Sequence, residues 1–121
     1  MSKKRVYLDF INDINDEILN IEEFVDSLSY EDFITDRKTL RAVIRCFEII
    51  GEAVKNIPTE IREEYPDIPW KDMAGMRDKL IHEYFGIDYE ILWKTIKHII
   101  PEIKPLLKVV GWVEEQKHNI Y

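Results

Sequence analysis

Cysteine is almost absent from the sequence, and its scarcity excludes two kinds of stabilising link. The 121 residues include one cysteine, Cys46, so no disulfide can form within the chain and no zinc site can be built from cysteines. Cys46 lies among Ile44, Phe47 and Ile49, which favours a small buried hydrophobic side chain over a reactive thiol.

Glycine and proline are also scarce, at four and five residues. So few turn-forming residues argue against a β-sandwich or a barrel, and no segment alternates apolar and polar side chains over the length of a strand. The chain also lacks a glycine-rich phosphate loop, a nucleophile elbow and a zinc-protease motif. These absences exclude several common enzyme classes and favour a helical protein.

Long apolar runs are missing as well. No run approaches the roughly 20 residues that a membrane-spanning helix needs. The N-terminus, Met-Ser-Lys-Lys-Arg, continues directly into charged helical sequence without an apolar signal region. We therefore expect one cytoplasmic domain that has no membrane partner.

Positive charge is the minority, with 17 Lys and Arg against 24 Asp and Glu and a formal net charge of −7. Because nucleic acids are polyanions, this balance argues against broad, non-specific nucleic-acid binding. If RNA is the substrate, a local positive site must bind it.

Apolar residues recur every three or four positions in the first half of the chain, which predicts amphipathic helices. One stripe predicts a long helix over about residues 4–29, followed by a short polar turn. A second long helix is predicted from a cap at Asp36 to about Asn56, and Pro58 ends it. The two stripes are Leu8, Ile11, Ile14, Ile18, Ile21, Val25 and Leu28, and Leu40, Val43, Ile44, Phe47, Ile50, Val54 and Ile57.

The second half of the chain predicts one short helix and the start of a third long one. The short helix covers about residues 59–65, before a proline-containing connection. Pro69 suits the first turn of the third long helix, and Gly86 suits its C-terminal cap.

A last helix completes the predicted fold. Asp88 can cap it, and Pro101 and Pro105 should kink or break it. The predicted fold class is all-α: an antiparallel four-helix bundle with a short extra helix, formed by residues 1–110. Residues 111–121 are predicted to be a loosely ordered C-terminal tail.

The segment from Arg77 to Tyr84 offers more chemistry than any other part of the chain. A guanidinium group can hold a phosphate as a planar fork, and a histidine can transfer a proton near neutral pH. These types predict metal-free cleavage of RNA, in which His82 transfers a proton and Arg77 stabilises the charge of the phosphorane. Asp78, one helical turn before His82, could orient its imidazole, and Tyr84 could position the phosphate.

The helical spacing does not aim both catalytic candidates at one point. On a regular helix Arg77 and His82 lie about 140° apart. The arginine could bend round, the helix could unwind near Gly86, or a second subunit could complete the site. The third option is the most economical and predicts a dimer with a shared cleft.

The same residues also fit roles without chemistry. Arg77 could pair with Glu83 or with an acidic residue of another helix, and Tyr84 could be a core residue with its hydroxyl at the edge. Glu48 and Glu52, one turn apart, could form half of a carboxylate metal site. No Glu-x-x-His accompanies them, so a solvated or interhelical pairing role is favoured.

The pattern Arg77-x4-His82-x-Tyr84 resembles the R-x4-H-x-Y motif of HepT-like proteins, a branch of the HEPN superfamily of helical ribonucleases. The resemblance extends over roughly residues 5–110. Its other elements are Ile50-Gly51-Glu52-Ala53, Ile68-Pro69-Trp70, Met73-Ala74-Gly75-Met76-Arg77-Asp78, and Asp88 with Trp93.

The resemblance implies a homodimer with the two motifs facing a cleft at its interface. It implies a metal-independent endoribonuclease without a cofactor, the toxin of a type VII toxin–antitoxin pair, with tRNA among its targets. By position, Arg77 and His82 become the catalytic pair, and Asp78 occupies the polar position after the arginine. Tyr84 becomes the residue that a cognate nucleotidyltransferase of the MntA kind adenylylates with ATP, which silences the toxin.

An alternative function belongs to a different class. The acidic balance and the Arg77–His82 spacing also fit a non-catalytic helical dimer that binds a nucleotidyltransferase partner or nucleotides and presents Tyr84 as a substrate.

Overall fold

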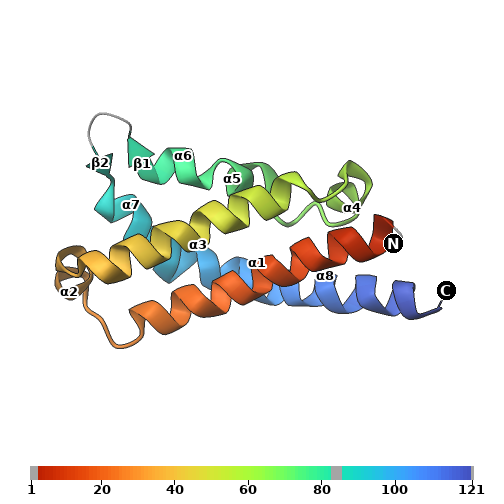
Figure 1. The fold of residues 1–121 in the computed structure, drawn as a ribbon, viewed down its shortest axis with the longest axis horizontal. Helices are drawn as coiled ribbons and strands as arrows, with labels where there is room; N and C mark the ends of the chain where they lie inside the picture. Colours follow the sequence, from red (N-terminus) through yellow and green to blue (C-terminus); the bar gives the residue numbers. More distant parts are fainter. Residues whose placement is uncertain (1–2, 83–85, 121) are drawn as a thin grey trace.

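Helical segments run antiparallel to one another along the length of the molecule (Figure 1). The computed structural model describes residues 3–82 and 86–120, with the backbone alone for residues 3–6, 81, 82, 118 and 120. The antiparallel segments are α1 (Lys3–Val25), α3 (Arg37–Lys55), α5 (Trp70–Ala74) with α6 (Met76–Leu80), and α7 (Tyr89–Lys94), the π-helical turn η1 (Thr95–Ile99) and α8 (Ile100–Ile120). The predicted all-α bundle is confirmed.

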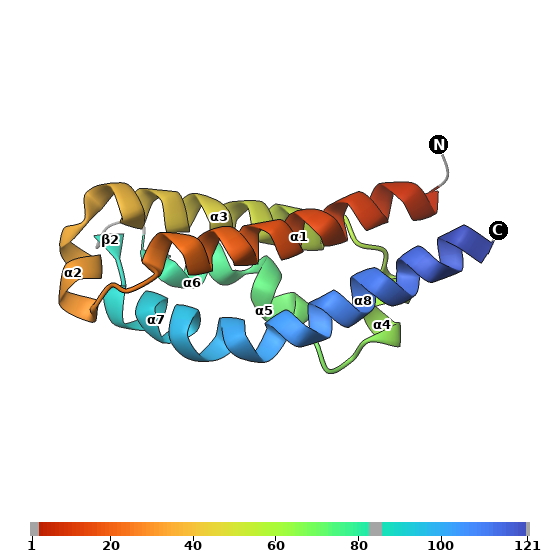
Figure 2. The ribbon, with the colours of Figure 1, turned by 90° about the horizontal axis from the view of Figure 1, so that it is seen from below.

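The core lies where the apolar stripes of these antiparallel segments meet. Figure 2 shows α1 and α3 side by side, α7 to α8 along the opposite side, and α5 and α6 between them. Within the described residues, no helix is both long enough and apolar enough to cross a membrane. The largest side chains that are almost completely buried are Phe33, Phe47, Ile11, Ile14, Ile18, Ile21, Ile50, Ile57, Met73, Leu80, Leu92 and Ile100.

Both predicted aspartate caps are present. The side chain of Asp36 accepts a hydrogen bond from the backbone N–H of Thr39 at 3.1 Å and begins α3. Asp88 accepts one from the N–H of Ile91, also at 3.1 Å, and begins α7. The short helix α4 (Thr59–Glu64) agrees with its prediction.

A helix occupies the segment that the sequence pattern predicts to be a polar turn. This helix, α2 (Tyr30–Thr35), is capped by Ser29, whose hydroxyl accepts from the N–H of Asp32. Its Phe33 is buried against Trp93, with the ring centroids 5.1 Å apart. Tyr30 also packs against Trp93, with the ring centroids 5.9 Å apart. These contacts hold a six-residue helix that is too short to be stable alone.

The prediction of a continuous third long helix is wrong, because this helix is interrupted once and ends early. Gly75 separates α5 from α6, and α6 ends at Leu80. Strand β1 (Ile81–His82) then pairs antiparallel with β2 (Gly86–Ile87). Gly86 has a φ of 79°, which glycine adopts without strain, so it serves this hairpin instead of capping a helix. The carbonyl of Leu80 accepts a hydrogen bond from the N–H of Asp88 at 3.0 Å, which fixes the return of the chain.

The last helix, predicted to kink or break at Pro101 and Pro105, is irregular before Pro101 but does not break, and the predicted loose tail is wrong. Helix α8 runs through Pro105 to Ile120, and the irregular part is the π-helical turn η1, which ends two residues before Pro101. A proline has no N–H to donate to the preceding turn, which allows the wider π-helical spacing there. The segment beyond residue 110 is held in place because Glu114 is buried and accepts hydrogen bonds from Tyr7 and Tyr65.

Candidate functional site

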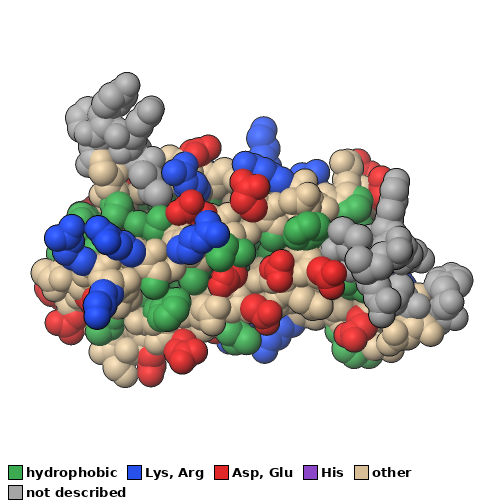
Figure 3. Space-filling model, in the orientation of Figure 1, with side chains coloured by type: hydrophobic (Ala, Val, Ile, Leu, Met, Phe, Trp, Pro, Cys, Tyr) green, Lys and Arg blue, Asp and Glu red, His purple; other side chains and the backbone are tan. Residues whose placement is uncertain are grey.

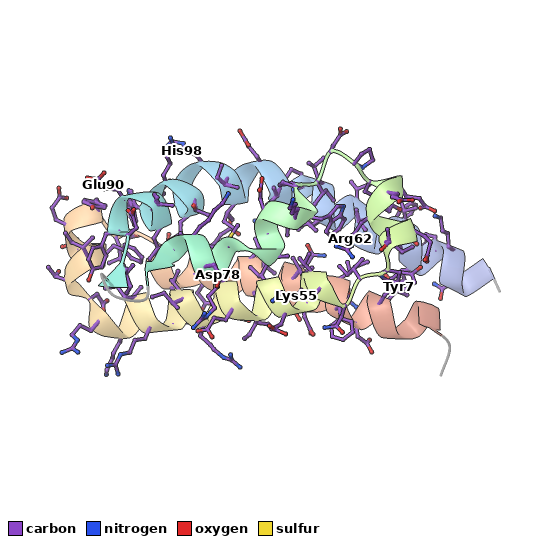
Figure 4. The ribbon with its side chains drawn as sticks, turned by 90° about the horizontal axis from the view of Figure 1, so that it is seen from above. Tyr7, Lys55, Arg62, Asp78, Glu90 and His98 are labelled. Atoms are coloured by element: carbon purple, nitrogen blue, oxygen red, sulfur yellow. The ribbon has the colours of Figure 1, made fainter. Side chains whose placement is uncertain are left out.

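A polar hollow of about 380 Å³ opens between α3 and α6. Figure 4 shows two of its residues, Lys55 on α3 and Asp78 on α6. Charged side chains of both signs border it, so it is suited to a charged ligand and not to an apolar one. The lining residues are Arg45, Glu48, Gly51, Glu52, Lys55, Ala74, Arg77 and Asp78.

Gly51 allows the two sides of the hollow to approach each other. A Cβ atom at this position would lie 3.2 Å from the carbonyl oxygen of Ala74, which is tighter than ordinary contact. Without that atom, α3 packs directly against the end of α5, and the following turn carries Arg77 toward α3. Gly51, which belongs to the segment Ile50-Gly51-Glu52-Ala53 of the family resemblance, therefore has a packing role beside the candidate site.

The guanidinium of Arg77 is the central charged group of the hollow. Its side chain is 53% exposed, its Nε lies 3.5 Å from Oε2 of Glu48, and its Nη1 lies 3.7 Å from Oδ1 of Asp78. Arg45 approaches the same Glu48 oxygen at 4.0 Å. These ion pairs are longer than hydrogen bonds, so the guanidinium donors keep capacity for another acceptor.

The structure shows a partner for Arg77, whereas Glu83, the other partner that the sequence allows, lies outside the described residues. Arg77 pairs with an acidic residue of another helix, and Glu48 has the interhelical pairing role. Among the described residues, no three His, Cys, Asp or Glu side chains come together in a way that could hold a metal ion.

Asp78 does not have the helical relation to His82 that its spacing predicts. Because α6 ends at Leu80, the two residues are not one turn apart on a continuous helix. The side chain of Asp78 is 85% exposed and pairs with Arg77 instead. Asp78 is therefore a partner of Arg77 in the structure. Helix geometry no longer supports its predicted role of orienting the imidazole of His82.

The other two candidates lie only partly within the described residues. The backbone of His82 is in β1, opposite Gly86, and its side chain is outside the described part. Tyr84 lies outside the described residues altogether. Their catalytic and modification roles stay predictions.

Arg45 is a lining residue that is not among the candidates predicted from the sequence. Its spacing of three residues from Glu48 on a predicted helix is the signal that connects them, because residues three apart lie on one face. The spacing does not predict that α6 packs beside this part of α3. That packing makes Glu48 a shared partner of Arg45 and Arg77.

Cys46 is outside the hollow and has no part in it. It is buried, as predicted, and burial together with the nearby Glu17 raises the pKa of its thiol to about 12. A thiol with such a pKa is protonated at neutral pH and is a poor nucleophile.

Comparison with known proteins supplies the family. The family model described as "Ribonuclease HepT-like" matches residues 14–110. No solved structure matches the protein significantly.

Relatives of similar length agree with this match. The chain is 54% identical over 101 residues to "Probable ribonuclease HepT" of Thermococcus cleftensis, covering 84% of this chain and 92% of that protein. It is 49% identical over 117 residues to "Putative RNase MJ1216" of Methanocaldococcus jannaschii, covering 96% and 97%. It is 51% identical over 114 residues to "Putative RNase MJ0125" of the same organism, covering 93% and 98%. The chain therefore belongs to the ribonuclease HepT-like family of endoribonucleases.

Proposed function

We propose that this protein is a metal-independent endoribonuclease toxin of a type VII toxin–antitoxin system, acting in the cytoplasm as a homodimer. The observation that carries the proposal is the position of Arg77. Its guanidinium is half exposed at a polar hollow, and the partners that the structure describes hold it only by long ion pairs. Arg77 precedes His82 by five residues. The ribonuclease names of the relatives support the same activity.

The proposed reaction uses the 2′-hydroxyl of the RNA itself. His82 removes its proton, the 2′-oxygen attacks the adjacent phosphorus, and the bond from phosphorus to the 5′-oxygen breaks. The 5′-oxygen takes up a proton, which leaves a 2′,3′-cyclic phosphate and a 5′-hydroxyl. Arg77 stabilises the charge that develops on the phosphoryl oxygens. Asp78 pairs with Arg77, and Tyr84 positions the phosphate. In a dimer the histidine of one protomer can act as base while that of its partner acts as acid.

Substitution of the proposed catalytic pair tests this function. We expect His82→Ala and Arg77→Ala each to lower the rate of RNA cleavage by roughly 10²- to 10⁴-fold, because each removes a group that acts in the transition state. The matched control is His98→Ala. His98 is exposed on η1 and points outward on the side of the molecule away from α3 (Figure 4). The measurement is cleavage of purified cellular RNA, tRNA included, by protein prepared without its antitoxin.

Three results would contradict the proposal. The first is equal RNA cleavage by the wild type and His82→Ala, which would indicate a contaminating nuclease. The second is that neither protein cuts any cellular RNA. The third is loss of cleavage in a chelator such as EDTA, which would contradict metal independence but not the nuclease activity.

We propose further that a cognate nucleotidyltransferase of the MntA kind silences the toxin by adenylylating Tyr84. One AMP group would add negative charge and bulk in the motif that contains Arg77, where RNA phosphates are proposed to bind. After co-expression with the partner, mass spectrometry should show an increase of about 329 Da per AMP group. The control is Tyr84→Phe, which has no phenolic hydroxyl to modify and should gain no mass. A wild type that gains mass at another residue would refute the assignment of Tyr84.

A second candidate function is favoured by one observation. Glu48 and Asp78 already lie beside Arg77, which suits a docking surface as well as a catalytic one. In that case the protein is a non-catalytic dimer that binds the nucleotidyltransferase or nucleotides. Arg77→Ala would then weaken partner binding while RNA turnover stayed at background for every variant.

A further inference from the structure

The first half of α3 carries a stripe of positive charge. Arg37, Arg41 and Arg45 follow one another at steps of four residues, so they lie along one face of the helix. All three are exposed. From Arg37 to Phe47 the helix contains four basic residues and no acidic one, in a chain whose net charge is −7. We call Arg37, Arg41 and Arg45 the α3 arginine stripe.

The stripe leads directly to the candidate active site. Its last member, Arg45, borders the polar hollow and approaches the same Glu48 oxygen as Arg77. Its first two members form no ion pair with a carboxylate of any residue that the structure describes. A row of available guanidinium groups therefore ends beside the arginine to which catalysis is attributed.

Figure 3 shows that positive and negative side chains are unevenly distributed over the surface. Blue side chains gather over the end of the molecule where α3 begins, whereas red side chains predominate over α1 on the same face. A polyanion approaching this face is repelled by α1 and attracted to the beginning of α3. The stripe therefore meets the requirement that an acidic protein must bind RNA at a local positive site.

We propose that the α3 arginine stripe binds the sugar–phosphate backbone of the RNA strand and guides the scissile phosphate to Arg77. This inference rests on the proposed ribonuclease function and adds the residues that hold the substrate. Successive members of the stripe are about 6 Å apart along the helix axis, which is comparable with the separation of successive phosphates in a strand. Contacts to phosphates carry no base information, so the stripe binds RNA without regard to its sequence.

The chemistry of the stripe favours RNA over an acidic protein as its occupant. None of the large apolar side chains that are exposed in the described part of the chain lies on α3. Protein interfaces use buried aromatic or aliphatic anchors, whereas nucleic-acid interfaces are polar and strongly positive. A face with regularly spaced arginines and no apolar anchor fits the second description.

The test is a double substitution, Arg37→Gln with Arg41→Gln, which leaves Arg45 and Arg77 in place. Binding is measured in the His82→Ala background, so that the probe is not cut. The probe is a fluorescein-labelled single-stranded RNA of mixed sequence, and its anisotropy is followed at several salt concentrations. The control is Lys94→Gln with Lys108→Gln, which removes the same charge from exposed positions of α7 and α8.

We expect the stripe variant to bind RNA about tenfold more weakly than the control. The association constant K falls as the salt concentration rises, and the slope of log K against log salt should be less steep in the stripe variant by about 1.4. Each phosphate contact to a single strand contributes about 0.7 to this slope, and the variant loses two. A second RNA of different sequence should lose the same affinity. In the presence of His82, cleavage by the stripe variant should show a higher KM with kcat unchanged.

Other outcomes overturn the inference and can be told apart from failure of the proposed function. If the wild type cuts RNA and the stripe variant binds it as tightly as the control, the stripe is not the RNA site although the nuclease stands. If the stripe variant keeps its RNA affinity but loses binding to a labelled polyglutamate peptide, the stripe docks an acidic protein. If RNA binds through the stripe and no variant cuts it, the inference holds and the proposed nuclease falls.

Discussion

Glu48 sets the charge around Arg77 more directly than any other described residue. One of its carboxylate oxygens, Oε2, pairs with Arg77 of α6 and with Arg45 of its own helix, α3. In the proposed complex a phosphate takes the place of this carboxylate, because both are anions and both suit the guanidinium fork. Glu48 is therefore expected to hold Arg77 in position and to compete with the substrate.

Glu48→Gln should consequently strengthen RNA binding. A half-exposed ion pair contributes up to about 1 kcal/mol, so we expect the Kd for RNA to fall by as much as about fivefold. The measurement is anisotropy titration at low salt in the His82→Ala background.

Glu52→Gln is the matched control for this prediction. Glu52 lies one turn further along α3, pairs with Lys55 and, among the described residues, forms no ion pair with Arg77. It loses the same unit of negative charge. If both variants bind RNA equally tightly, the effect comes from net charge alone and the competition at Arg77 is disproved.

Among single residues, those whose roles depend on neighbours along the chain were predictable. The caps Asp36 and Asp88 act on backbone groups three residues away, and Cys46 lies on an apolar stripe. Arg45 and Glu48 obtain their roles from a residue about 30 positions later, and local spacing contains no information about such a pair.

At the scale of elements, the approach of α5 to α3 decides where Arg77 lies. The two helices meet at Gly51, where the structure leaves no room for a larger side chain without a shift of the Ala74 carbonyl. The α5–α6 break at Gly75 then turns the chain so that Arg77 faces α3. The sequence pattern predicts one continuous helix here because α5 and α6 both have helical periodicity.

Gly51→Val should therefore destabilise the fold and disturb the site. Placing a branched side chain against the Ala74 carbonyl should lower the free energy of unfolding by about 1–3 kcal/mol, as overpacking does elsewhere. Urea denaturation measures the change. Gly75→Ala is the control, since its Cβ would meet only the Lys71 carbonyl at an ordinary 3.6 Å. Equal stability of the Gly51→Val variant and the wild type would show that the helices separate without cost.

At the scale of the whole molecule, Glu114 joins the two ends of the chain. Its buried carboxylate is only 1% exposed, and it accepts hydrogen bonds from Tyr7 on α1 at 2.7 Å and from Tyr65 after α4 at 2.5 Å. Lys117 bridges Glu114 and Glu64 at 2.9 and 2.7 Å. The segment beyond residue 110 is thus part of the folded bundle, and not a tail.

The electrostatics of this cluster predict how stability depends on pH. Burial opposes ionisation of Glu114, but the hydrogen bonds from Tyr65, Lys117 and Tyr7 outweigh it and lower the pKa of the carboxyl. A group whose pKa is lower in the folded state stabilises the fold above its unfolded pKa, about 4.3 for glutamate. That contribution is lost as the pH falls through the folded pKa.

Glu114→Gln should lower the free energy of unfolding at pH 7 by about 1–3 kcal/mol, because charge-assisted hydrogen bonds are lost in the interior. The difference from the wild type should shrink as the pH falls from the unfolded-state pKa of about 4.3 toward the lowered pKa of the folded carboxyl. Denaturation at pH 7 and pH 3.5 measures it, with the exposed Glu115→Gln as control. A difference that stays constant with pH would refute the role assigned to the ionised carboxylate.

The all-α class, the two long N-terminal helices, the caps and the resemblance to the HepT-like family could all be read from the amino-acid sequence. These properties depend on residues a few positions apart, where helical periodicity and capping act directly. Three features required the folded structure: the interruption of the third helix, the continuation of the last helix through Pro105 to bury Glu114, and the meeting of Arg77 with Glu48 and Arg45 at one hollow. These depend on contacts between distant segments, whose energies outweigh local preferences once the helices pack.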